Sequence, residues 1–216
     1  MLKWVGISTL IGLIAGVGAI AFYTAMHLAT GFFLGTIVGY LPPDAAGEGS
    51  TRITPLWTVA HLWLLPVVTM LGGLVSGIIV FSLAPESEGG GQDAAIAAFH
   101  QGKPIRAQVI LVKLVASAIL IGTGGSAGRE GPAAQISAGF GSTLATLFRL
   151  GTQERRVALA IGVGAGIGAI FRAPLGGAIL AAEILYQGDL EVEVLIPALI
   201  ASVVGYSLFG VWFGWG

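Results

Sequence analysis

Three long stretches without a charged residue limit what this chain can fold into. They lie between Lys3 and Asp44, between Arg52 and Glu86, and from Val194 to Gly216. Each exceeds the roughly 20 apolar residues that cross a bilayer as a helix. The first stretch is too long for one upright helix, so we expect it to tilt, break or protrude. The pattern predicts an integral membrane protein.

The composition excludes most other classes. Of the 216 residues only 10% are charged and 55% are hydrophobic, whereas soluble domains carry roughly 25% charge. Such a chain has too few polar side chains to coat a soluble globule. Ten Lys and Arg against eleven Asp and Glu exclude a basic nucleic-acid binder. The absence of cysteine excludes disulfides and thiolate metal sites.

The middle of the chain, from Glu86 to Glu193, has shorter apolar segments separated by clusters of Gly and Pro. Irregular backbone at bilayer depth is tolerated only where protein buries it or where it lines a watery cavity. Broken helices that meet inside the membrane are typical of transporters. We therefore predict an all-α fold class: a polytopic membrane helix bundle with broken and tilted helices, forming a single transmembrane domain over 1–216. The expected helices cover 4–38, 56–82, 93–101, 105–122, 132–148, 154–170, 174–186 and 191–213.

The basic residues predict the orientation. One side of the bundle would carry Lys3, Lys103, Arg106, Arg149, Arg155 and Arg156. Only Arg52 lies in the connection 42–55, which would be on the other side. Because Lys and Arg are enriched in cytoplasmic connections, we expect a multi-pass protein of the cell membrane with a cytoplasmic N-terminus.

The segment from Gly122 to Pro132 carries the clearest sign of chemistry. It reads Gly-Thr-Gly-Gly-Ser-Ala-Gly-Arg-Glu-Gly-Pro and joins two apolar helices. Pro132 suits the first helical position, and the free amides of that helix would point into the Gly-rich loop and bind an anion. Glu130 would compete with the anion for these amides, which makes it a candidate gate. The alternative is an interfacial loop in which Arg129 and Glu130 form a local ion pair.

The sequence Gly128-Arg129-Glu130-Gly131-Pro132 resembles the GREGP motif of the CLC family of chloride channels and proton-coupled chloride transporters. Other motifs follow in family order. The family's GSGIP motif corresponds to Gly89-Gly90-Gly91-Gln92-Asp93. Its lysine-bearing helix before GREGP is similar to Leu111-Val112-Lys113. Its helix pair after GREGP is similar to the segment that contains Phe171–Leu175 and Ala182-Glu183. The resemblance implies one half of a CLC-type inverted repeat.

The resemblance also implies roles for individual residues. Glu130 matches the gating glutamate, which occupies the outer anion site and carries protons in exchangers. The amides around Gly128 and Gly131 match the cradle of that site, and Arg129 matches a basic residue that makes the pathway electropositive.

Four further residues match the inner part of the pathway. Gly89, Gly90 and Gly91 correspond to the loop that lines the central anion site. Lys113 corresponds to a second basic residue of the pathway. A lysine that extends toward the interface from a helix end is the alternative.

Three positions depart from the family pattern. Gly90 replaces the serine whose hydroxyl helps to hold the central anion, which leaves the selectivity for chloride over nitrate open. Asp93 replaces a proline and is expected to be a helix N-cap. Glu183, a possible inner acid, is followed by Ile184 where many exchangers have their proton-transfer glutamate, so we expect little proton coupling by that route.

The length is the last departure, because CLC subunits contain two repeats and this chain matches the first. We expect chloride or another small anion to be transported, by channel or by proton-coupled exchange, in a homodimer or with a partner that carries the second repeat. The alternative is a half-length scaffold that transports nothing. Nothing in the sequence indicates an enzyme, a cofactor or a metal site, and His27, His61 and His100 are interpreted as packing or interfacial residues.

Overall fold

The computed structural model describes residues 2–43, 61–185 and 190–215, and all regular structure within these ranges is helical. Arg52, the connection around it and the first residues of the helix expected from 56 lie outside the described residues, as does residue 186. The all-α fold class is confirmed.

The first apolar stretch forms one unbroken rod. Helix α1 (Leu2–Thr30) continues as the π-helical segment η1 (Gly31–Val38), which ends at Gly39 in a left-handed conformation with φ of 78°. The rod is 36 residues long from Lys3 to Val38, which exceeds the roughly 30 Å hydrocarbon core at about 1.5 Å per residue. It must therefore tilt or protrude.

The remaining helices follow the expected order. They are α2 (Leu64–Leu83), the 3-10 turn η3 (Pro85–Ser87), α3 (Gln92–Gln101), α4 (Ala107–Gly122), α5 (Glu130–Leu147), α6 (Thr152–Ile170), α7 (Pro174–Glu183) and α8 (Val192–Phe213). In the described part of the chain, the α1–η1 rod, α2 and α8 are long and apolar enough to cross a membrane, and α4 is a shorter apolar helix. The short α3 and α7 are the broken segments that the Gly and Pro clusters predicted.

Several helix starts differ from the expected ones, and two of these differences concern the glycine segments. Helix α5 begins at Glu130 rather than Pro132, with Arg129 at the N-cap, because proline is tolerated throughout the first turn, where no amide needs a partner in the helix. Helix α3 has Gly91 rather than Asp93 at its N-cap. Asp93 lies in the first turn instead, where its negative charge is favourable near the positive end of the helix dipole.

Helix α6 forms the centre of the bundle. Every residue from Val157 to Ile170 is buried, and the helix packs against α1, α5, α7 and α8. Small residues allow this contact: a Cβ added at Gly162 would overlap the backbone of Ser137 on α5, and one at Gly164 would lie 3.0 Å from Ala181 on α7. Close approach of small residues is how membrane helices gain packing energy without a hydrophobic driving force.

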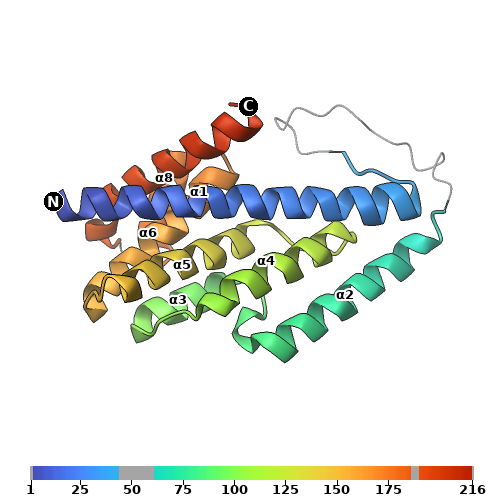
Figure 1. Cartoon of the computed structure of the whole chain (residues 1–216), viewed down its shortest axis with the longest axis horizontal. Coiled ribbons are helices and arrows are strands. Elements are labelled where there is room, and N and C mark those ends of the chain that lie inside the picture. The colour runs from blue at the N-terminus through green and yellow to red at the C-terminus, as the bar shows by residue number, and fades with distance from the viewer. Residues whose placement is uncertain (1, 44–60, 186–189, 216) are drawn as a thin grey trace.

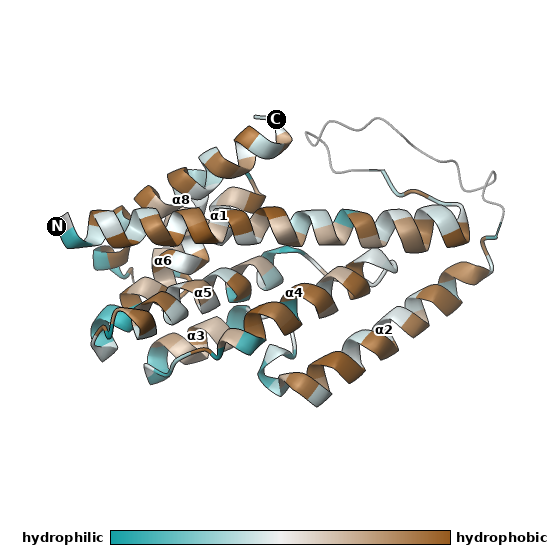
Figure 2. Cartoon of the chain, in the orientation of Figure 1, coloured by the Kyte–Doolittle hydropathy of each residue, from teal (hydrophilic) through white to brown (hydrophobic). Residues whose placement is uncertain are grey.

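Figure 1 shows α1 running the length of the bundle, with α8 crossing it and α2 at the opposite edge. Helices α2 and α4 are joined by hydrogen bonds, from Ser76 Oγ to the Ala116 carbonyl (3.0 Å) and from Thr69 Oγ1 to the Thr123 carbonyl (2.8 Å). Apolar residues cover most of the helical surface, and the hydrophilic ones gather at helix ends and in connections (Figure 2). This distribution suits a bundle surrounded by lipid.

Candidate functional site

The N-terminus of α5 lies beside the connection that precedes α3. A Cβ added at Gly131 would overlap the carbonyl oxygen of Gly90, and one at Gly91 would lie 2.8 Å from the carbonyl oxygen of Gly131. Gly89 and Gly91 have φ of 75° and 100°, which favours glycine. The structure therefore brings together the two glycine segments that the family resemblance assigned to the outer and the central anion site.

Two buried side chains hold the connection by its carbonyl groups. Lys113 of α4 is 3% exposed, and its Nζ donates to the carbonyls of Ser87 (3.0 Å) and Gly89 (2.7 Å). Gln135 of α5 is 1% exposed, and its Nε2 donates to the carbonyl of Glu86 (2.8 Å). Because these donors engage carbonyls of residues 86–89, they fix the path of the connection beside α5.

Gln135 was not among the residues selected from the sequence. It is a polar residue, one turn beyond Pro132, in a helix whose other buried residues are small or apolar. An isolated amide on the buried face of such a helix needs hydrogen-bond partners, and this requirement could have identified Gln135 from the sequence.

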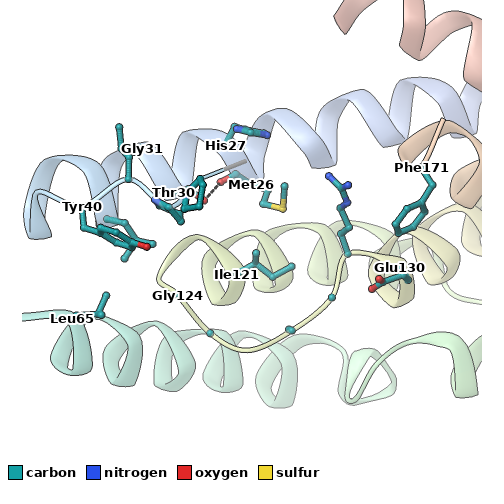
Figure 3. A pocket seen from close by; sticks show the side chains of 18 residues that line it. Met26, His27, Thr30, Gly31, Tyr40, Leu65, Ile121, Gly124, Glu130 and Phe171 are labelled. Carbon is teal, nitrogen blue, oxygen red and sulfur yellow. Dashed lines mark hydrogen bonds between the residues drawn. The ribbon is translucent and has the colours of Figure 1, made fainter. Parts of the chain in front are cut away.

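Two cavities meet at Glu130. The first, which we call the loop pocket, has a volume of about 660 Å³ and is lined by Gly89, Gly90, Lys113 and Gly131 among others. The second, the α1 pocket, has a volume of about 820 Å³. Its lining includes Met26, His27, Tyr40, Arg129 and Phe171 (Figure 3).

Glu130 lines both pockets, as do Ile121, Ala127 and Gly128. The carboxylate of Glu130 folds back over the Cα of Gly128, so that a Cβ at Gly128 would overlap Oε2. Figure 3 shows this carboxylate at one end of the α1 pocket, near Phe171. The carboxylate therefore lies where the linings of the two pockets overlap.

Arg129 directly precedes Glu130 and also lines the α1 pocket. Its guanidinium carbon lies 5.3 Å from the centre of the Phe171 ring and 6.0 Å from that of Tyr23. Contacts of this kind are cation–π interactions. With His27 also in the lining, the α1 pocket places a guanidinium, an imidazole and aromatic rings beside the Glu130 carboxylate.

Of the other residues selected from the sequence, Glu183 and His100 lie outside both pockets, and His27 lines the α1 pocket. Glu183 is the last residue of α7, is exposed, and lines neither the loop pocket nor the α1 pocket. Ile184 caps the same helix. His27 contacts the Tyr23 ring at 4.2 Å between centroids, and Nε2 of His100 lies 2.6 Å from the Leu185 carbonyl, so both pack against neighbours.

The fold and the two glycine segments define a class of protein: a polytopic membrane protein in which a helix N-terminus meets an irregular connection at a polar site, as in transporters and channels. The family model described as voltage gated chloride channel matches residues 72–216. The chain belongs to this family, the CLC chloride channels and exchangers, which are not enzymes.

Individual relatives agree with this assignment. An uncharacterized protein of Methanocaldococcus jannaschii is 32% identical over 97% of this chain and 44% of its own length. A chloride/fluoride channel protein of Pseudomonas syringae pv. tomato is 28% identical, and an H(+)/Cl(-) exchange transporter, ClcA, of Vibrio cholerae is 27% identical; 41% of each is covered. The chain thus spans less than half the length of these relatives.

Solved structures show the same fold. A CLC-type fluoride/proton antiporter superposes with a TM-score of 0.77 at 21% identity, over 100% of this chain and 48% of the antiporter chain. A slow cyanobacterial Cl-/H+ antiporter gives a TM-score of 0.76 at 22% identity, over 97% and 46% of the two chains. The architecture predicted from the sequence, one half of a CLC fold, is confirmed.

Proposed function

We propose that this chain forms one half of an anion pathway in which Glu130 is the gate. The observation that carries the proposal is the position of the Glu130 carboxylate, which is folded over Gly128 between the loop pocket and the α1 pocket. Glu130 lies in the first turn of α5, where unpaired amides and the helix dipole favour a negative group. An anion and the carboxylate would compete for this place.

The transported ion would be a small halide. The relatives' names include chloride and fluoride. In the loop pocket, Gly90 offers no side-chain hydroxyl, and a Cβ there would have no neighbour within 4 Å. An anion would be held by backbone N–H groups and the positive field of Lys113 and Arg129. Ile184 cannot titrate, so any coupled proton would use another route than the position after Glu183.

The rest of the pathway would come from a second repeat. Each relative named above extends over more than twice the length that this chain covers. We propose that the working unit contains a second half, in this or another polypeptide, and that it dimerises in the cell membrane with the N-terminus of α1 in the cytoplasm. A scaffold without transport is the second candidate. It is favoured only by this partial coverage.

The test is anion flux from proteoliposomes that contain the transport assembly purified with this chain. Glu130→Gln, which imitates a protonated carboxyl, should raise chloride and fluoride flux and remove its dependence on pH. Glu193→Gln makes the same chemical change at an exposed position in the first turn of α8 and should leave flux unchanged. Equal flux and pH response in wild type and Glu130→Gln would overturn the gate, and no flux from any variant would favour the scaffold.

A further inference from the structure

Two aromatic rings from distant parts of the chain hold the guanidinium of Arg129. Tyr23 lies on α1, and Phe171 directly follows α6. The guanidinium carbon is 6.0 Å from one ring centre and 5.3 Å from the other. Arg129 itself is the N-cap of α5, so three helices contribute to this one arrangement.

Tyr23 is itself fixed by its neighbours. It is 8% exposed and contacts the rings of Phe209 and Phe213 on α8 edge-on, at 5.4 Å and 4.8 Å between centroids. Phe171 differs, because it is 37% exposed and lines the α1 pocket beside Arg129. One ring therefore belongs to the packed interior and the other to the wall of the cavity.

The arrangement matters for an anion because an arginine side chain is long and flexible. A cation–π contact attracts the positive charge without itself using an N–H donor. Two rings therefore restrict where the positive charge lies, and the field of that charge attracts an anion to the α1 pocket. The lining of the α1 pocket contains three further titratable side chains, those of His27, Tyr40 and Glu130.

We infer that Tyr23 and Phe171 are positioning residues for anion capture: they hold the Arg129 guanidinium at the α1 pocket, where it concentrates small anions beside the gate. This inference rests on the proposed function, because the captured anion is the transported one. It adds two residues that act through Arg129 and do not themselves bind the ion.

The first test separates capture from maximal rate. In the transport assembly, Phe171→Leu and Tyr23→Leu should raise the half-saturating chloride concentration about two- to fivefold, the range that an exposed cation–π contact supports. Maximal flux should not change. The conservative variants Phe171→Tyr and Tyr23→Phe keep an aromatic ring and should keep the wild-type half-saturation. A fall in maximal flux with unchanged half-saturation would overturn the inference.

The second test asks whether the rings act through Arg129. The double variant Phe171→Leu, Arg129→Gln should have the same half-saturating chloride concentration as Arg129→Gln alone, because the guanidinium that the ring positions is gone. Additive effects of the two substitutions would contradict the inference. Phe171 is suited to this test because its partial exposure allows a leucine without a large buried cavity.

A third measurement does not depend on transport. In protein labelled with ¹⁵N-arginine, the side-chain N–H signal of Arg129 should show a ring-current shift, which Phe171→Leu reduces and Phe171→Tyr retains. A signal that is the same in all three proteins would overturn the inference that the Phe171 ring positions Arg129. If Glu130→Gln fails to alter flux while the shift behaves as expected, the gate is wrong and the positioning of Arg129 stands.

Discussion

The carboxylate of Glu130 occupies the space that a side chain at Gly128 would need. An added Cβ at Gly128 would overlap Oε2 of Glu130, and no backbone atom is among its three nearest neighbours. Gly128 also does not require a left-handed conformation. The glycine of this motif therefore provides room for the carboxylate two residues later.

Gly128→Ala should displace the Glu130 carboxylate and open the connection between the two pockets. The far end of a flexible side chain can rotate away, so stability should change little. Anion flux should rise toward that of Glu130→Gln and lose part of its pH dependence. Flux measurements on Gly128→Ala, Glu130→Gln and the double variant test this, and the double variant should equal Glu130→Gln.

The control is Gly73→Ala on α2, where an added Cβ has no neighbour within 4 Å. It should leave flux and stability unchanged. Flux in Gly128→Ala that matches the wild type would show that the carboxylate does not block the pathway.

Gly131→Ala should be destabilising for a different reason. Its Cβ would overlap the carbonyl oxygen of Gly90, and a backbone atom cannot rotate away. We expect the free energy of unfolding in detergent to fall by about 1–3 kcal/mol, as overpacking does. Gly90→Ala, on the other side of the same contact, adds its Cβ to open space and should be neutral. Equal stability of both variants would mean that α5 and the loop are not in contact.

Gly90→Ser tests the anion site itself. The added hydroxyl has room in the loop pocket, and Gly90 is not among the glycines with positive φ. One hydrogen bond to a charged group contributes about 1.5 kcal/mol or more, so chloride affinity should rise about tenfold, with a smaller gain for nitrate. Calorimetric titration of both anions measures this. Identical chloride affinity in the two proteins would place the anion elsewhere.

Lys113→Met should loosen the connection before α3. It removes the donor to the carbonyls of Ser87 and Gly89, of which that of the buried Ser87 would lose a partner away from water. We expect a loss of about 1–3 kcal/mol in unfolding free energy, together with weaker anion binding. Lys103→Met, at an exposed lysine, is the matched control. If the two variants unfold at the same temperature, Lys113 does not support the loop.

The Glu86–Arg106 ion pair predicts an acid-dependent contribution to stability. Arg106 Nη2 donates to Glu86 Oε2 over 2.8 Å, and this hydrogen bonding holds the pKa of the Glu86 carboxyl below its ordinary value of about 4.3. A lowered pKa in the folded state stabilises the protein above pH ~4.3, and the contribution disappears as the pH falls through the folded-state value.

Arg106→Gln should therefore unfold at a slightly lower temperature than wild type near neutral pH. The difference in unfolding temperature should shrink as the pH falls below the ordinary pKa of a glutamate and through the lowered pKa of Glu86. The side chains of Arg106 and Glu86 are 55% and 46% exposed, so the effect is small and should also decrease with added salt. If the difference in unfolding temperature stays constant with pH, Arg106 stabilises the protein by packing rather than by its charge.

The sequence by itself determined the membrane class, the helical fold and the order of the helices. These properties depend on local composition: charge-free stretches, Gly and Pro breaks, and one Gly-rich segment with a glutamate. The same segment selected Glu130, Arg129 and the surrounding glycines. The start of α5 was wrong by two residues and that of α3 by one, because several positions in a first turn or cap satisfy the same local rules.

Only the tertiary structure decided which groups meet. Gly91 and Gly131 touch because α3 and α5 begin at the same place in the bundle. Lys113 donates to the loop because α4 passes beside it. Local patterns contain no information on such long-range distances, and packing around α6 sets them. For the same reason no motif revealed that Tyr23 and Phe171 would hold Arg129, since their contact exists only when α1 and the end of α6 are brought to the N-terminus of α5.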